Sequence, residues 1–131
     1  MSVELRIVAL GAVLLFVHIF AAIRAKTAQY GRAWNTSARD ESLPAPNPLV
    51  GRLTRAQANF AETFPIAIVA LIGVGVAGRT SEWTAIGGWI WLGARLVYLP
   101  LYAAGIPVVR TLVYTISMIG IFIVLWPLLA P

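Results

Sequence analysis

The stretch "GRLTRAQANFAETFPIAIVAL", residues 51–71, decides the fold. It ends in an almost unbroken apolar run, which is typical of a membrane-spanning helix. Arg55, Asn59 and Glu62 precede that run at spacings i, i+4 and i+7, which place them on one face of a helix. Because a polar face inside a membrane is costly, this face predicts a functional site.

The composition indicates an integral membrane protein. Of 131 residues, 60% are hydrophobic and only 11% are charged, more apolar surface than a soluble domain of this size could bury. There is no cysteine, which excludes disulfides, thiolate metal sites and a cysteine nucleophile, and the single histidine, His18, is expected to be a packing or interface residue. The net charge of +5 does not predict nucleic-acid binding, because no basic run is interleaved with aromatic residues.

Four apolar segments predict an all-α, antiparallel bundle of four transmembrane helices. At 1.5 Å per residue, about 20 residues cross the hydrocarbon core of a bilayer. The chain reads as one domain, residues 1–131, in which short connections make neighbouring helices antiparallel. The helices are expected at about residues 4–25, 52–78, 82–104 and 107–130, with one long loop over residues 26–51.

The distribution of Lys and Arg predicts the orientation. Six basic residues lie in or beside the long loop, whereas the opposite side has only Arg6 and Arg79. Basic residues mark cytoplasmic loops, so the long loop is expected in the cytoplasm and both termini outside. Because the chain is short and has no recognisable targeting signal, we expect a bacterial inner membrane. The six residues are Arg24, Lys26, Arg32, Arg39, Arg52 and Arg55.

Depth in the membrane brings Glu62 and Arg95 to one level. Glu62 is expected about 15 Å and Arg95 about 14 Å from the cytoplasmic ends of their helices. Either charge alone would cost roughly 2.5–3.5 kcal/mol in hydrocarbon, so we expect the two to neutralise each other.

The third and fourth helices both carry polar faces at this level. Arg95, Tyr98 and Tyr102 share one face of the third helix, and Arg110 and Tyr114 begin a similar face on the fourth. A buried ion pair flanked by snorkelling arginines would explain part of this pattern. An excess of guanidinium groups fits a small anionic or zwitterionic, peptide-like ligand better.

Two segments identify a family. "RAQANFAETFP", residues 55–65, and "ARLVYLPLYAAGIPVVR", residues 94–110, resemble the second-helix and third-to-fourth-helix segments of the MAPEG family. These are membrane-associated proteins of eicosanoid and glutathione metabolism, among them microsomal glutathione transferases. The resemblance covers nearly the whole chain.

The resemblance implies a homotrimer that binds glutathione as co-substrate in clefts between subunits. Arg110 matches the arginine that stabilises the glutathione thiolate, although Tyr102 could donate to the sulfur instead. A basic residue of a neighbouring first helix, Arg24 or Lys26, could reach the site. By motif position, the glutathione-binding residues are Arg55, Gln57, Asn59, Glu62, Arg95, Tyr98, Tyr102 and Arg110.

The function that the resemblance implies is a glutathione-dependent transferase acting on a lipophilic electrophile from the bilayer, with peroxidase chemistry as an alternative. A non-catalytic trimer that binds glutathione or lipid would use the same residues. A small four-helix exporter is the remaining alternative, but its acidic residue would be expected on the first helix, which has none between Ile7 and Ile23.

Overall fold

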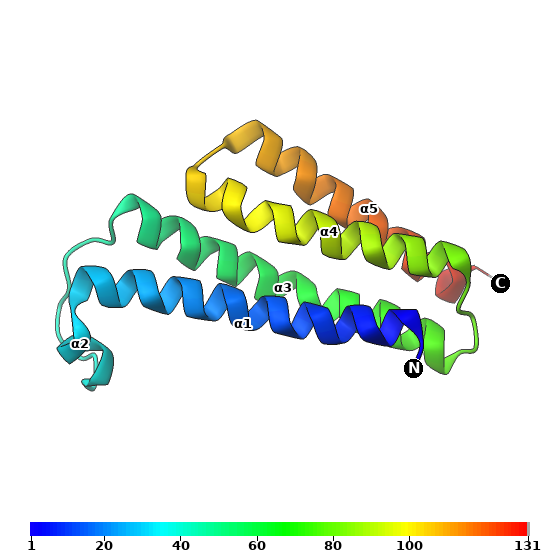
Figure 1. Ribbon diagram of the computed structural model, residues 1–131, viewed down its shortest axis with the longest axis horizontal. Helices are drawn as coiled ribbons and strands as arrows, with labels where there is room; N and C mark the ends of the chain where they lie inside the picture. The colour runs from blue at the N-terminus through cyan, green and yellow to red at the C-terminus, as the bar shows by residue number, and fades with distance from the viewer. Residues whose placement is uncertain (131) are drawn as a thin grey trace.

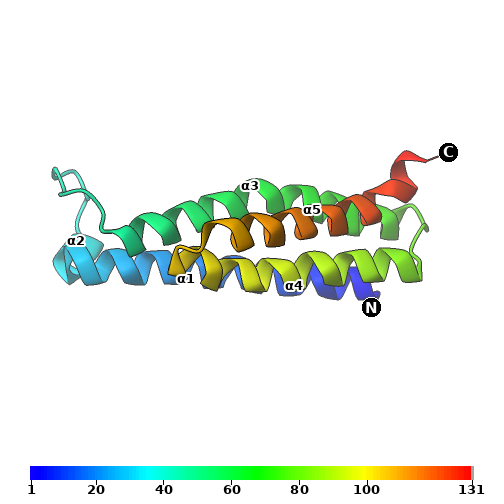
Figure 2. The ribbon, with the colours of Figure 1, turned by 90° about the horizontal axis from the view of Figure 1, so that it is seen from above.

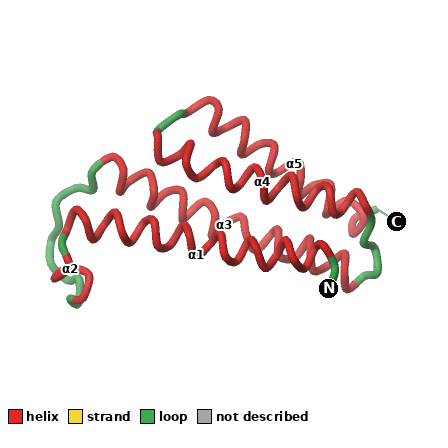
Figure 3. Tube along the Cα trace, in the orientation of Figure 1, coloured by secondary structure: helices red, strands yellow, loops and turns green. Residues whose placement is uncertain are grey.

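The computed structural model describes residues 1–130, in which helices are joined by loops (Figure 1, Figure 3) and there is no strand. The all-α prediction is confirmed. A short helix, α2, follows the first long one. The helices are α1 (Val3–Tyr30), α2 (Arg32–Thr36), α3 (Pro48–Val76), α4 (Glu82–Ala104) and α5 (Pro107–Leu129).

The four long helices form two antiparallel pairs. α1 packs mainly on α3, and α4 packs mainly on α5 (Figure 1). Seen from above, α1 and α4 form one layer while α3 and α5 form the other (Figure 2). Both termini lie at one end of the bundle and α2 lies at the other, where the α4–α5 pair stops short of the α1–α3 pair.

Three of these helices are long and apolar enough to cross a membrane, namely α1, α3 and α5. α4 has the same 23 residues as α5 but is not among them. Its middle carries the charged Arg95, which is completely buried against the other helices. Arg95, together with the glycines and aromatic residues around it, lowers the mean hydropathy of α4.

The first connection is shorter and more ordered than the predicted loop over residues 26–51. α1 continues to Tyr30, and α3 begins at Pro48 rather than at residue 52. The side chain of Asn47 accepts from the Val50 amide at 2.9 Å and Pro48 occupies the first turn, which together form a helix start. Contacts between distant residues fix the remainder, because Gln29 donates to Ala45 O and accepts from the Asn47 amide.

Aromatic rings and glycines hold the centre of the bundle together. Phe60 and Phe64 of α3 stack with Trp91 of α4, and the Phe64 and Trp91 ring centroids are 5.9 Å apart. Gly11 of α1 lies directly beneath them, since a Cβ at this position would be 2.7 Å from the Phe64 ring. The rings are buried, so this layer connects three helices at the level where the polar faces begin.

Candidate functional site

Arg95 is the centre of the polar region. It extends from α4 and is 0% exposed. Its Nη2 donates to Asn59 Oδ1 on α3 at 2.9 Å, and its guanidinium carbon lies 4.7 Å from the Tyr98 ring centroid. Nε and Nη1 are buried and have no hydrogen-bond partner among the described residues. A buried cation with free N–H groups can accept an anionic or carbonyl oxygen.

The expected Glu62–Arg95 pair is wrong. Glu62 has an exposed side chain, and the one hydrogen bond that Arg95 makes within residues 1–130 goes to Asn59. The two residues do lie at comparable depth, but depth ignores the angle around the helix. At about 100° per residue, Glu62 is rotated roughly 200° from Phe60, the residue of α3 that faces the core. Glu62 therefore points away from the protomer.

A second group of polar residues lies one turn towards the α2 end of the bundle. Nε of Arg55 donates to the Tyr102 hydroxyl at 3.3 Å. The Arg110 guanidinium carbon lies 4.5 Å from the centroid of the same ring. The Tyr102 ring in turn meets Tyr98 edge-on at 5.5 Å. Arginines of α3, α4 and α5 thus all contact the phenol rings of Tyr98 and Tyr102.

A small cavity of about 110 Å³ opens between these helices. Of the eight predicted binding residues, Asn59, Tyr98 and Arg110 line it. Arg55, Arg95 and Tyr102 contact this group, whereas Glu62 faces outward and the side chain of Gln57 has no hydrogen bond among the described residues. The complete lining is Asn59, Tyr98, Arg110, Thr111 and Tyr114.

Thr111 and Phe60 were not predicted as site residues. Thr111 follows Arg110 directly on α5, one turn after Pro107 at the start of that helix. Phe60 interrupts the polar stripe of α3, where its ring lies 5.0 Å from the Arg95 guanidinium carbon. An aromatic residue between two polar positions can be recognised as a cation–π partner only when the position of the cation is known.

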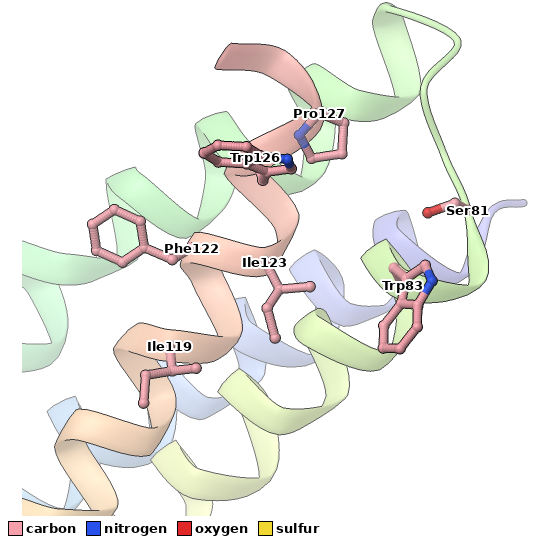
Figure 4. Close-up of a pocket in the computed structure, with 7 residues that line it drawn as sticks. All are labelled: Ser81, Trp83, Ile119, Phe122, Ile123, Trp126 and Pro127. Atoms are coloured by element: carbon pink, nitrogen blue, oxygen red, sulfur yellow. The ribbon is translucent and has the colours of Figure 1, made fainter. Parts of the chain in front are cut away.

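A larger groove of about 580 Å³ lies at the end where the termini are (Figure 4). Its lining is aliphatic and aromatic apart from Ser81, and includes Trp83 of α4 and Phe122 of α5 (Figure 4). No ionisable side chain lines it, so it offers nothing that would hold or activate a charged ligand. The described residues also contain no group of three side chains able to hold a metal ion.

Comparison with known protein families matches residues 7–130 to the MAPEG family model. The chain belongs to the MAPEG family. The resemblance read from residues 55–65 and 94–110 is therefore confirmed, and the matched region contains all of the polar residues described above. No curated protein matches the chain. MAPEG membership and three apolar helices make this a membrane protein, related to proteins of glutathione or eicosanoid metabolism.

Proposed function

We propose that this MAPEG protein binds glutathione at the Arg95 cluster and transfers its thiolate to a lipophilic electrophile. One observation carries the proposal: a fully buried guanidinium with two unpartnered nitrogens beside a polar cavity. Leaving such donors unpaired in a native fold is costly, so a ligand that supplies oxygen acceptors would be bound preferentially. Glutathione offers two carboxylates and two peptide carbonyls.

The site is incomplete in one protomer. A volume of about 110 Å³ is well below the roughly 300–1,000 Å³ of ordinary ligand pockets. Glu62 and Arg55 are both exposed on α3, within or beside a spanning segment. A charge that faces hydrocarbon costs a few kcal/mol, so a second copy of the chain is expected to cover this face and complete the cleft. We propose the homotrimer that the family resemblance implies.

The residues divide into binding and activating groups. Arg95 and Arg55 would hold carboxylates, Gln57 would add a polar contact, and Glu62 would receive the ammonium group across the subunit boundary. Arg110 or Tyr102 would stabilise the sulfur as thiolate, since a cation or a hydrogen-bond donor favours the charged form. The thiol proton leaves to water, the sulfur bonds to the electrophilic carbon, and that carbon releases its leaving group.

The electrophile would reach the sulfur from the bilayer. The cavity lies towards the end of the bundle that carries the long, basic loop, and the distribution of Lys and Arg favours a cytoplasmic position for this loop. Glutathione would therefore enter from the cytoplasm, and both termini would lie outside. We propose a bacterial inner membrane as the location.

The test has two stages on one sample of detergent-purified protein. Calorimetric titration with glutathione measures binding, and chlorodinitrobenzene then measures conjugation. Binding together with turnover supports the transferase, whereas binding without conjugation or peroxidase turnover favours the non-catalytic trimer. Absence of glutathione binding would contradict both, and transport in proteoliposomes without glutathione would then favour the exporter.

A further inference from the structure

His18 is a buried histidine that the proposed reaction does not use. It lies in the middle of α1 and is 1% exposed. Its Nδ1 is 2.8 Å from Leu14 O, and since a carbonyl only accepts, Nδ1 must carry the proton and donate. This bond fixes the ring against its own helix. The other nitrogen, Nε2, is buried without a partner among the described residues.

The His18 ring rests on Phe60. The two ring centroids are 4.6 Å apart with an interplanar angle of 20°, so the rings are stacked. Phe60 is 0% exposed and is confined further by Phe64, at 5.3 Å, and by Trp91. The position of the Phe60 ring in this layer therefore depends on an imidazole supplied by a different helix.

Phe60 also supports Arg95. The guanidinium carbon lies 5.0 Å from the Phe60 centroid, within the range of a cation–π contact. Because Arg95 makes only one hydrogen bond within residues 1–130, to Asn59, aromatic rings supply most of the contacts that orient it. Any shift of the Phe60 ring changes the direction in which the free Nε and Nη1 groups point.

We infer that His18 is a positioning residue for the glutathione site: through Phe60, it sets the orientation of the Arg95 guanidinium. The expected effect on glutathione affinity rests on the proposed function. The dependence of the Arg95 orientation on His18 is independent of that function. An uncharged imidazole suits this role, since a second cation against Phe60 would repel the guanidinium.

The experiment compares His18→Leu with His18→Phe and with Ile7→Val. Leucine removes both the ring and the donor, whereas phenylalanine keeps the ring. Ile7 is a buried residue of the same helix that packs on Gly88, so its variant reports a general loss of core packing. The first readout is the rate of Arg95 modification by phenylglyoxal in the ligand-free protein, quantified by peptide mass spectrometry. The second is the split between KM for glutathione and kcat.

We expect His18→Leu to raise both the labelling rate and KM for glutathione by about two- to tenfold, the factor equivalent to one aromatic pair. kcat at saturating glutathione should stay within about twofold. His18→Phe should have a labelling rate and a KM close to those of the wild type.

If His18→Leu behaves as Ile7→Val does in both readouts, the inference is overturned. If His18→Leu does not fold, His18→Gln, which loses the ring but can still donate to Leu14 O, must show the same two effects, and its failure to do so overturns the inference.

The labelling readout separates this inference from the proposed function. If wild-type protein does not bind glutathione, the proposed function fails while the labelling rates still decide whether His18 controls Arg95. If wild-type protein binds glutathione and the labelling rates of His18→Leu and Ile7→Val agree, the proposed function stands and the inference fails.

Discussion

Arg95 and Asn59 form a buried hydrogen bond between α4 and α3 at the polar site, with 2.9 Å between Nη2 and Oδ1. Asn59→Ala removes the single protein acceptor that Arg95 has within residues 1–130. We expect a loss of about 1.5–3 kcal/mol of stability, the range for a hydrogen bond to a charged group, together with weaker glutathione binding. Thermal unfolding in detergent measures the first effect and calorimetric titration the second.

Asn35→Ala is the matched control for Asn59→Ala. Asn35 also accepts from an arginine through its side-chain oxygen, with Arg39 Nη2 at 3.0 Å, but this pair is exposed to solvent. An exposed interaction of this kind contributes little, and the bond that Asn35 Nδ2 donates to Thr27 Oγ1 at 3.1 Å joins two neutral groups. Asn35→Ala should therefore lower the unfolding temperature less than Asn59→Ala does. Equal losses in the two variants would contradict the special role assigned to the buried bond.

Gly120 allows α5 to touch α4. A Cβ at Gly120 would be 2.6 Å from Gly87 O and 2.7 Å from the Trp91 amide nitrogen, both backbone atoms that cannot move aside. Gly120→Ala should therefore separate the two helices at a cost of about 1–3 kcal/mol, measured by thermal unfolding.

Gly93→Ala is the control, since Gly93 lies inside α4 with open space around its Cβ position. It should leave stability unchanged or raise it by up to about 1 kcal/mol, because alanine favours helix. A Gly120→Ala protein as stable as Gly93→Ala would contradict the close approach.

The comparison of sequence with structure shows which features are local. Apolar runs in the sequence predict where α1, α3 and α5 lie. The distribution of Lys and Arg predicts the orientation in the membrane without knowledge of any tertiary contact. The extension of α1 to Tyr30 was missed, because Gln29 is bound by loop residues far along the chain.

The site shows the same division between local and long-range information. Spacing brought Arg95, Tyr98 and Tyr102 onto one face, and rise per residue gave their depth. Neither quantity specifies which residues of α3 face α4, and this rotation of the helix decides that Asn59 rather than Glu62 meets Arg95. The contact between His18 and Phe60 is likewise a consequence of packing, since nothing in either local sequence indicates the other ring.

The pH dependence of conjugation distinguishes Arg110 from Tyr102 as the group that stabilises the thiolate. A thiol has an ordinary pKa near 8.5, and a neighbouring cation lowers that pKa by favouring the anion. If Arg110 supplies this effect, Arg110→Ala returns the pKa of bound glutathione towards its ordinary value. Activity at pH 7 then falls and recovers as the pH rises towards about 8.5.

Tyr102→Phe is the companion variant. It keeps the ring that Arg110 contacts at 4.5 Å but removes the hydroxyl that accepts from Arg55. With Arg110 as the activating group, Tyr102→Phe should keep the wild-type pH profile of kcat/KM. A profile displaced to higher pH in Tyr102→Phe and unchanged in Arg110→Ala would assign the role to the tyrosine. Size-exclusion chromatography should give the same elution volume for both variants and the wild type, which would rule out loss of assembly.

Gly105 ends α4 in a left-handed conformation, with φ of 74°, directly against the guanidinium of Arg52. A Cβ at this position would be 2.6 Å from Arg52 Cζ, and Arg52 Nη1 donates to Ala103 O at the end of the same helix. Gly105→Ala should therefore lower the free energy of unfolding by about 1–2 kcal/mol through the left-handed backbone, plus the cost of displacing an arginine that caps α4.

Gly78→Ala separates the two contributions, because Gly78 has φ of 64° with nothing within 4 Å of its Cβ position. Thermal unfolding should rank Gly105→Ala below Gly78→Ala, and in an Arg52→Ala background the two substitutions should cost the same. A difference that persists without Arg52 would show that the clash at Gly105 has another source.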